Sequence, residues 1–131
     1  MRARLGAAVL VALVAGCGSD EPPAAPDVLP AVEAYVDAVN ARDLDALAES
    51  FAPDGEVVDV SRTIAGRAAI RAWARDEVIG GTLRVLSVAE RRDDGRKLLV
   101  HWAPRGSEGW RAHYDFTVSA SGITTADLQY A

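Results

Sequence analysis

The 131-residue sequence has few of the residues on which protein chemistry often depends. It has one cysteine and two histidines, so an internal disulfide is excluded and a metal site of these residues is not expected. Its net charge of −5 argues against nucleic acid as a partner, because phosphates require a basic surface. It also has no nucleophile elbow and no phosphate-binding glycine loop. We therefore expect neither a metal nor a cofactor.

The first part of the chain has the pattern of an export signal. Arg2 and Arg4 precede an apolar run over 5–14, which is too short to be a permanent membrane span. The segment Leu13-Val14-Ala15-Gly16-Cys17 resembles the lipobox of bacterial lipoproteins. That resemblance implies removal of residues 1–16 and a lipid on the Cys17 thiol, and the alternative is a plain signal peptide. Residues 17–27 are polar and rich in proline, as expected for a flexible tether. We expect an exported protein anchored to the outer face of a bacterial cell membrane.

Residues 28–131 have the pattern of one small α+β domain. Apolar residues at steps of three and four predict a helix from Val28 to Arg42 and a second helix, capped by Asp43, that carries Phe51 on its apolar side. A turn is expected at 53–55 and a third helix at 66–77. Between and after them the sequence predicts strands at 56–60, 63–65, 82–91, 96–103, 110–120 and 123–130. Helices followed by hairpin-linked strands indicate a mostly antiparallel sheet.

The strand predicted at 110–120 alternates between two kinds of side chain. Trp110, Ala112, Tyr114, Phe116 and Val118 share one face, which we expect to lie against the helices. The opposite face is polar and includes Arg111, His113 and Thr117. That face is therefore either wet or part of a dimer interface.

Three segments of the domain resemble a known superfamily. They are residues 35–47, 51–55 and 66–71, and they are similar to the SnoaL-like, nuclear transport factor 2-like proteins, in particular the ketosteroid isomerase branch. The resemblance covers nearly all of 28–131 and implies a cone-shaped curved sheet wrapped around the N-terminal helices. It also implies a pocket at the wide end of the cone.

The same resemblance implies candidate catalytic residues. In the isomerases a tyrosine on the first helix stabilises an oxyanion and an aspartate on the first strand moves a proton, and these roles fall on Tyr35 and Asp59. The second acid of the isomerases falls on Tyr114, while the neighbouring Asp115 belongs to the opposite face by parity. The isomerase set is therefore incomplete or altered.

Three functions remain open on these observations. The preferred one is binding of a small, largely apolar ligand in a conical pocket lined by Tyr35, Val57, Asp59, Trp73, Trp102, Tyr114 and Phe116. The second is an isomerase or cyclase with Asp59 as base and Tyr35 as oxyanion donor. The third is a domain that dimerises through its outer sheet face and assembles with envelope partners. Binding predicts an open cavity of several hundred Å³, whereas catalysis requires Asp59 and Tyr35 to converge in one dry pocket and is excluded if Asp59 points to solvent.

Overall fold

The computed structural model describes residues 27–131. The predicted signal peptide, Cys17 and the tether up to residue 26 lie outside the described residues. Between residues 27 and 131 no helix is both long and apolar enough to cross a bilayer. Asp27 is tied to the domain, because its carboxylate accepts hydrogen bonds from Arg96 Nη2 at 3.1 Å and from the Leu29 amide at 3.3 Å.

The helical half of the domain follows the sequence pattern closely. Pro30 lies in the first turn of the first helix, where its missing N–H costs nothing. The side chain of Asp43 caps the second helix by accepting a hydrogen bond from the Ala46 amide at 3.0 Å. The third helix continues into a wider π-helical turn. The elements are α1 (Pro30–Ala41), α2 (Leu44–Glu49), α3 (Arg67–Trp73) and η1 (Ala74–Val78).

Six strands form one sheet in the order β2-β1-β6-β5-β4-β3. Every neighbouring pair is antiparallel except β1 and β6, which run parallel. The predicted mostly antiparallel sheet is therefore confirmed. The strands are β1 (Phe51–Asp59), β2 (Arg62–Ala65), β3 (Thr82–Arg92), β4 (Gly95–Ala103), β5 (Trp110–Ser119) and β6 (Gly122–Tyr130).

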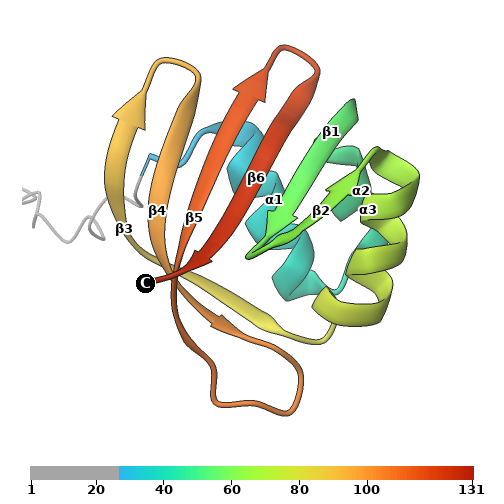
Figure 1. The fold of residues 1–131 in the computed structure, drawn as a ribbon, viewed down its shortest axis with the longest axis vertical. Coiled ribbons are helices and arrows are strands. Elements are labelled where there is room, and N and C mark those ends of the chain that lie inside the picture. The colour runs from blue at the N-terminus through green and yellow to red at the C-terminus, as the bar shows by residue number, and fades with distance from the viewer. Residues whose placement is uncertain (1–26) are drawn as a thin grey trace, which may run out of the picture.

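The sheet curves, and the helices lie on its inner side (Figure 1). Side chains from both layers form one core, which includes Tyr35 of α1, Phe51 and Val57 of β1 and Phe116 of β5, all nearly inaccessible to solvent. On β5 the even-numbered residues 112–116 are buried and their odd-numbered neighbours are not, as the alternation predicts. The predicted α+β cone is confirmed.

Two predictions about the entry into β1 are wrong. Phe51 begins β1 instead of ending α2, because the Ser50 hydroxyl donates to the Leu47 carbonyl and closes the helix before it. Residues 53–55 form no turn but lie within β1, where its register against β6 shifts. Gly55 is required there by a close approach, since a Cβ atom would lie 2.7 Å from the carbonyl oxygen of Ile123. The glycine therefore marks two backbones in contact, although it looks like a turn residue in the sequence.

Candidate functional site

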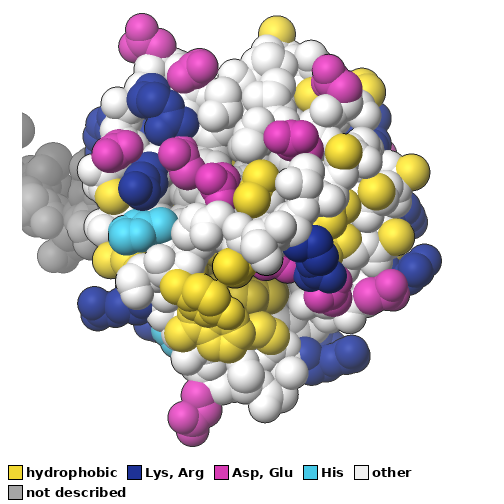
Figure 2. All heavy atoms as spheres, viewed as in Figure 1, with side chains coloured by type: hydrophobic (Ala, Val, Ile, Leu, Met, Phe, Trp, Pro, Cys, Tyr) yellow, Lys and Arg dark blue, Asp and Glu magenta, His cyan; other side chains and the backbone are white. Residues whose placement is uncertain are grey.

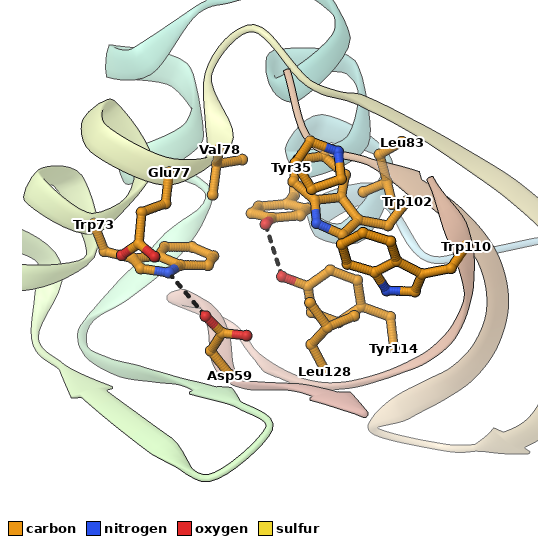
Figure 3. A pocket seen from close by; sticks show the side chains of 11 residues that line it. Tyr35, Asp59, Trp73, Glu77, Val78, Leu83, Trp102, Trp110, Tyr114 and Leu128 are labelled. Carbon is orange, nitrogen blue, oxygen red and sulfur yellow. Dashed lines mark hydrogen bonds between the residues drawn. The ribbon is translucent and has the colours of Figure 1, made fainter. Parts of the chain in front are cut away.

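A cavity of about 330 Å³ opens at one end of the cone (Figure 3). Its walls come from α1, the end of the third helix and its π-helical turn, and from every strand except β2. Its size suits a small organic molecule. The lining residues are Tyr35, Asp59, Trp73, Glu77, Val78, Leu83, Trp102, Pro104, Trp110, Tyr114 and Leu128.

The floor of the cavity is a pair of buried tyrosines, Tyr35 and Tyr114. Their hydroxyl oxygens are 2.7 Å apart and share a hydrogen bond. Below them both rings pack against Phe116, with ring centroids 5.5 Å from Tyr35 and 4.4 Å from Tyr114. Burial raises the pKa of both hydroxyls well above the ordinary value of tyrosine. Both tyrosines are therefore protonated at neutral pH. Because their mutual bond uses one of two protons, one O–H remains free to donate to a ligand.

The position of the floor follows from how α1 is held against the sheet. The side-chain amide of Asn40 donates to the Leu83 carbonyl at 2.8 Å and accepts from the Leu83 amide at 2.9 Å. It thus pairs with β3 as another strand would, and it fixes the helix that carries Tyr35. Tyr114 lies on β5, between Leu98 of β4 and Leu128 of β6.

Charged side chains stand at the mouth of the cavity. Oδ2 of Asp59 accepts hydrogen bonds from Arg62 at 2.6 Å and from the Trp73 indole at 3.4 Å. Arg62 also reaches both carboxylate oxygens of Glu77, at 2.8 and 3.0 Å. Its hydrogen bonds with Glu77, and then with Asp59, raise the pKa of the Arg62 guanidinium. Arg62 is therefore a permanent cation that bridges two carboxylates. We call these three residues the mouth triad.

An apolar rim adjoins the mouth triad. Val60, Trp110 and Tyr130 are 39%, 40% and 67% exposed, and all three line a small hollow that shares Asp59, Trp102, Trp110 and Leu128 with the cavity wall. The rings of Trp110 and Tyr130 pack with centroids 6.2 Å apart. Figure 2 shows a patch of hydrophobic side chains on this face of the molecule.

The structure gathers most of the predicted site residues around one cavity. Tyr35, Asp59, Trp73, Trp102 and Tyr114 all line it. Val57 and Phe116 do not. Both are completely buried in the core, deeper in the cone.

Asp115 lies on the outer face of the sheet, as parity predicts. Its carboxylate accepts a hydrogen bond from Arg92 at 2.8 Å, and Tyr114, not Asp115, lines the cavity. The row predicted for a dimer interface, Arg111, His113 and Thr117, belongs to this same face of β5. That interface stays a prediction.

The sequence pattern did not identify six of the lining residues: Glu77, Val78, Leu83, Pro104, Trp110 and Leu128. For two of these residues the strand pairing offers a signal that could have identified them. Trp110 pairs with Trp102 across the β4–β5 hairpin and shares a face with Tyr114. Leu128 pairs with both Asp59 and Tyr114, but this becomes visible only once β6 is placed between β1 and β5.

The arrangement offers a ligand three kinds of contact. The floor donates a hydrogen bond, aromatic rings form the walls, and a carboxylate stands at the mouth (Figure 3). Over residues 27–131, no group of at least three His, Cys, Asp or Glu side chains is arranged to hold a metal ion. The floor, the walls and the carboxylate at the mouth suit binding by shape and hydrogen bonding, or proton transfer between a carboxylate and a ligand.

Solved structures with this fold include proteins of several kinds. A Sinorhizobium meliloti protein predicted to be a polyketide cyclase is 26% identical, with a TM-score of 0.69 over 79% of this chain and 96% of that one. An epoxide hydrolase/cyclase-like enzyme of pyran ring formation in salinomycin is 20% identical, with a TM-score of 0.69 over 77% and 88%. A Catenulispora acidiphila protein with a ketosteroid isomerase-like fold, in complex with trimethylamine, is 19% identical, with a TM-score of 0.67 over 79% and 87%.

Sequence comparison places the chain in a family. No curated protein matches it. The SnoaL-like domain, in contrast, matches residues 32–126, a span that begins in α1 and ends in β6 and so includes nearly every element around the cavity. The chain therefore belongs to the SnoaL-like domain family and has the nuclear transport factor 2-like, ketosteroid isomerase-like fold.

Proposed function

We propose that this protein is a lipid-anchored envelope protein whose SnoaL-like domain binds a small, largely apolar ligand in the cavity. The observation that carries the proposal is the open volume of about 330 Å³ above the buried Tyr35–Tyr114 pair. A space of this volume inside a domain is normally filled by side chains, because protein interiors pack densely. An open cavity with aromatic walls and one free donor at its floor matches the general build of ligand sites.

The floor indicates where the ligand is polar. Since the two tyrosines hold one free O–H between them, they favour a ligand with a single oxygen or nitrogen acceptor at its inner end. The Catenulispora protein is in complex with trimethylamine. At 19% identity its likeness to this chain concerns the fold, so it leaves the ligand class open here.

Native mass spectrometry of the full chain, purified gently from its own host, tests the binding proposal. We expect a small molecule to co-purify and to be lost or reduced in the double variant Tyr35→Phe/Tyr114→Phe, which removes both hydroxyls of the floor. Tyr130→Phe is the matched control, because Tyr130 is exposed and does not line the cavity. A wild-type protein that is empty after repeated preparations would contradict the proposal.

The anchor is a separate part of the proposal and rests on the sequence of residues 1–17. Mass analysis of the N-terminal peptide of the mature protein tests it. We expect the peptide to begin at Cys17 and to carry a diacylglyceryl group, and we expect Cys17→Ser to release the protein from membranes. An unmodified N-terminus elsewhere would contradict the anchor without affecting the cavity.

A second candidate is a proton-transfer enzyme of the isomerase or cyclase type. It is favoured by Asp59 and Tyr35 lining the same cavity, with Oδ1 of Asp59 free of any hydrogen bond from residues 27–131 while Oδ2 is engaged. In this case Oδ1 takes the proton and the tyrosine pair stabilises the developing oxyanion. Once the co-purifying molecule is known, turnover that disappears in Asp59→Asn while binding persists would favour the enzyme over the binding protein.

A further inference from the structure

All three tryptophans of the chain line the one cavity described above. They face it together with the two tyrosines of the floor, so aromatic rings surround the space on several sides. Figure 3 shows Trp73 and Asp59 on one side of the tyrosine hydroxyls, with Trp102 and Trp110 on the other. Aromatic faces are electron-rich and attract cations.

The charged groups of the wall have one sign. Asp59 and Glu77 are acidic, and none of the described lining residues is basic. Arg62 lies outside the lining set and approaches the two carboxylates from the more exposed side, where 52% of its own side chain is accessible. The mouth triad therefore carries two negative charges and one positive charge.

One carboxylate oxygen of the mouth triad is left available to a ligand. Arg62 engages both oxygens of Glu77 and Oδ2 of Asp59, and Oδ2 also accepts from Trp73. Oδ1 of Asp59 is thus the one carboxylate oxygen of the triad that accepts no hydrogen bond from residues 27–131. Burial, and then the nearby charge of Asp59, raises the pKa of the Tyr35 hydroxyl. For Tyr114 the charge of Asp59 adds to the larger effects of burial and of Tyr35 on the pKa.

A neutral ligand gains little from this combination and an anion is repelled by it. An alkylated ammonium group gains twice, because indole and phenol faces attract it and because it neutralises the free carboxylate oxygen. Its methyl or methylene groups also tolerate an apolar wall, since an alkylated nitrogen has few or no N–H groups to satisfy.

We propose that the ligand of this cavity carries an organic cation of the alkylated ammonium class. The cation lies between the tryptophan rings and Oδ1 of Asp59, and the apolar remainder, ending in a hydrogen-bond acceptor, extends to the Tyr35–Tyr114 floor. This proposal rests on the ligand-binding function above and specifies the chemistry of its ligand.

A matched pair of probes tests it on the full-length wild-type protein. Hydroxyphenyl trimethylammonium and tert-butylphenol have nearly the same shape, and they differ by one positive charge because a carbon replaces the nitrogen. Calorimetric titration gives both affinities, and the fluorescence of the three cavity tryptophans follows the same binding. We expect the cation to bind at least about tenfold more tightly than the phenol.

Variants assign the preference to the proposed groups. Asp59→Asn keeps the shape of the side chain and removes its charge, and we expect it to bring the two affinities close together. Trp110→Leu should weaken the cation more than the phenol, whereas Tyr130→Leu, its exposed neighbour outside the cavity lining, should not change the ratio. The ratio of the two affinities in the wild-type protein tests the proposal by itself, even if one of the variants folds poorly.

The outcomes separate this proposal from the one on which it rests. Equal affinities in the wild type, or tighter binding of the phenol, would overturn the cationic ligand while leaving a ligand-binding cavity. Binding of neither probe would also overturn the cationic ligand. The co-purification experiment would then still test, independently, whether the cavity binds a ligand. A wild-type preference that survives unchanged in Asp59→Asn would place the cation elsewhere and overturn it as well.

Discussion

The floor of the cavity is buried and neutral, whereas its mouth is exposed and charged. At the floor, Tyr35 and Tyr114 are buried, neutral and packed on Phe116, and their one hydrogen bond is shielded from water. At the mouth, Arg62 and Glu77 are about half exposed and Asp59 is 24% exposed, so solvent and salt weaken their attraction. The floor should therefore determine stability, while the mouth should determine which ligand is selected.

The largest effect is expected from removing the support of the floor. Phe116→Ala deletes a fully buried ring in contact with both tyrosines and should cost about 3–5 kcal/mol of unfolding free energy. Trp110→Ala is the matched control at the mouth, because Trp110 is 40% exposed, and it should cost clearly less. Chemical denaturation measures both. Equal losses would contradict the division between floor and mouth.

The shared hydrogen bond of the floor should give the next largest effect. Tyr35→Phe removes one partner and leaves the buried hydroxyl of Tyr114 unpaired, at a cost of roughly 1–3 kcal/mol. The double variant Tyr35→Phe/Tyr114→Phe removes both hydroxyls and should be less destabilised than the sum of the single variants. A double-mutant cycle from denaturation curves measures this coupling. Strict additivity would mean that the two hydroxyls do not interact.

High pH provides a test of the floor that needs no substitution. Burial raises the pKa of both tyrosines in the folded protein, while in the unfolded chain they titrate near the ordinary value of 10.0. Above that pH the unfolded state binds fewer protons than the folded state, so stability falls as the pH rises, by up to about 1.4 kcal/mol per pH unit for each tyrosine. Unfolding measured between neutral and alkaline pH should show this slope. The double phenylalanine variant should lose much of it, and an unchanged slope there would assign the effect to other groups.

The smallest effect on stability is expected at the mouth. Arg62→Ala breaks two exposed ion pairs and should change the melting temperature little. Arg75→Ala should do the same, since Arg75 pairs with its neighbour Asp76 and does not line the cavity. The two variants should differ in binding. Loss of Arg62 leaves two uncompensated carboxylates, so hydroxyphenyl trimethylammonium should bind a few-fold more tightly at low salt, whereas Arg75→Ala should leave its affinity unchanged. Weaker binding in Arg62→Ala would contradict this role of the mouth triad.

The sequence predicts the floor better than it predicts the rest of the wall. The inward face of Tyr114 follows from strand periodicity, whereas Tyr35 is implied by the resemblance to the isomerases. Periodicity says nothing about depth along the cone, and so Val57 and Phe116, on the correct face, lie in the core below the cavity. The face on which a side chain lies is determined by the local sequence, whereas its depth along the cone depends on how the elements pack together.

The other residues that were missed depend on contacts between distant segments. Leu128 enters the wall because β6 pairs in parallel with β1, and a parallel pairing leaves no hairpin signal in the sequence. Gly55 looks like a turn residue, yet it is needed where β1 meets the backbone of Ile123. Glu77 was recognised as helical but not as a partner of Arg62, which is 15 residues away in the chain.

A crystal structure of the full chain grown with hydroxyphenyl trimethylammonium tests the central claim most directly. We expect the probe in the cavity, with its hydroxyl at hydrogen-bonding distance from Tyr35 or Tyr114 and its ammonium group beside Asp59 and the tryptophan rings. A probe bound elsewhere, for example in the groove between α1 and β3 that Val36 and Val85 line, with the cavity empty, would contradict the account.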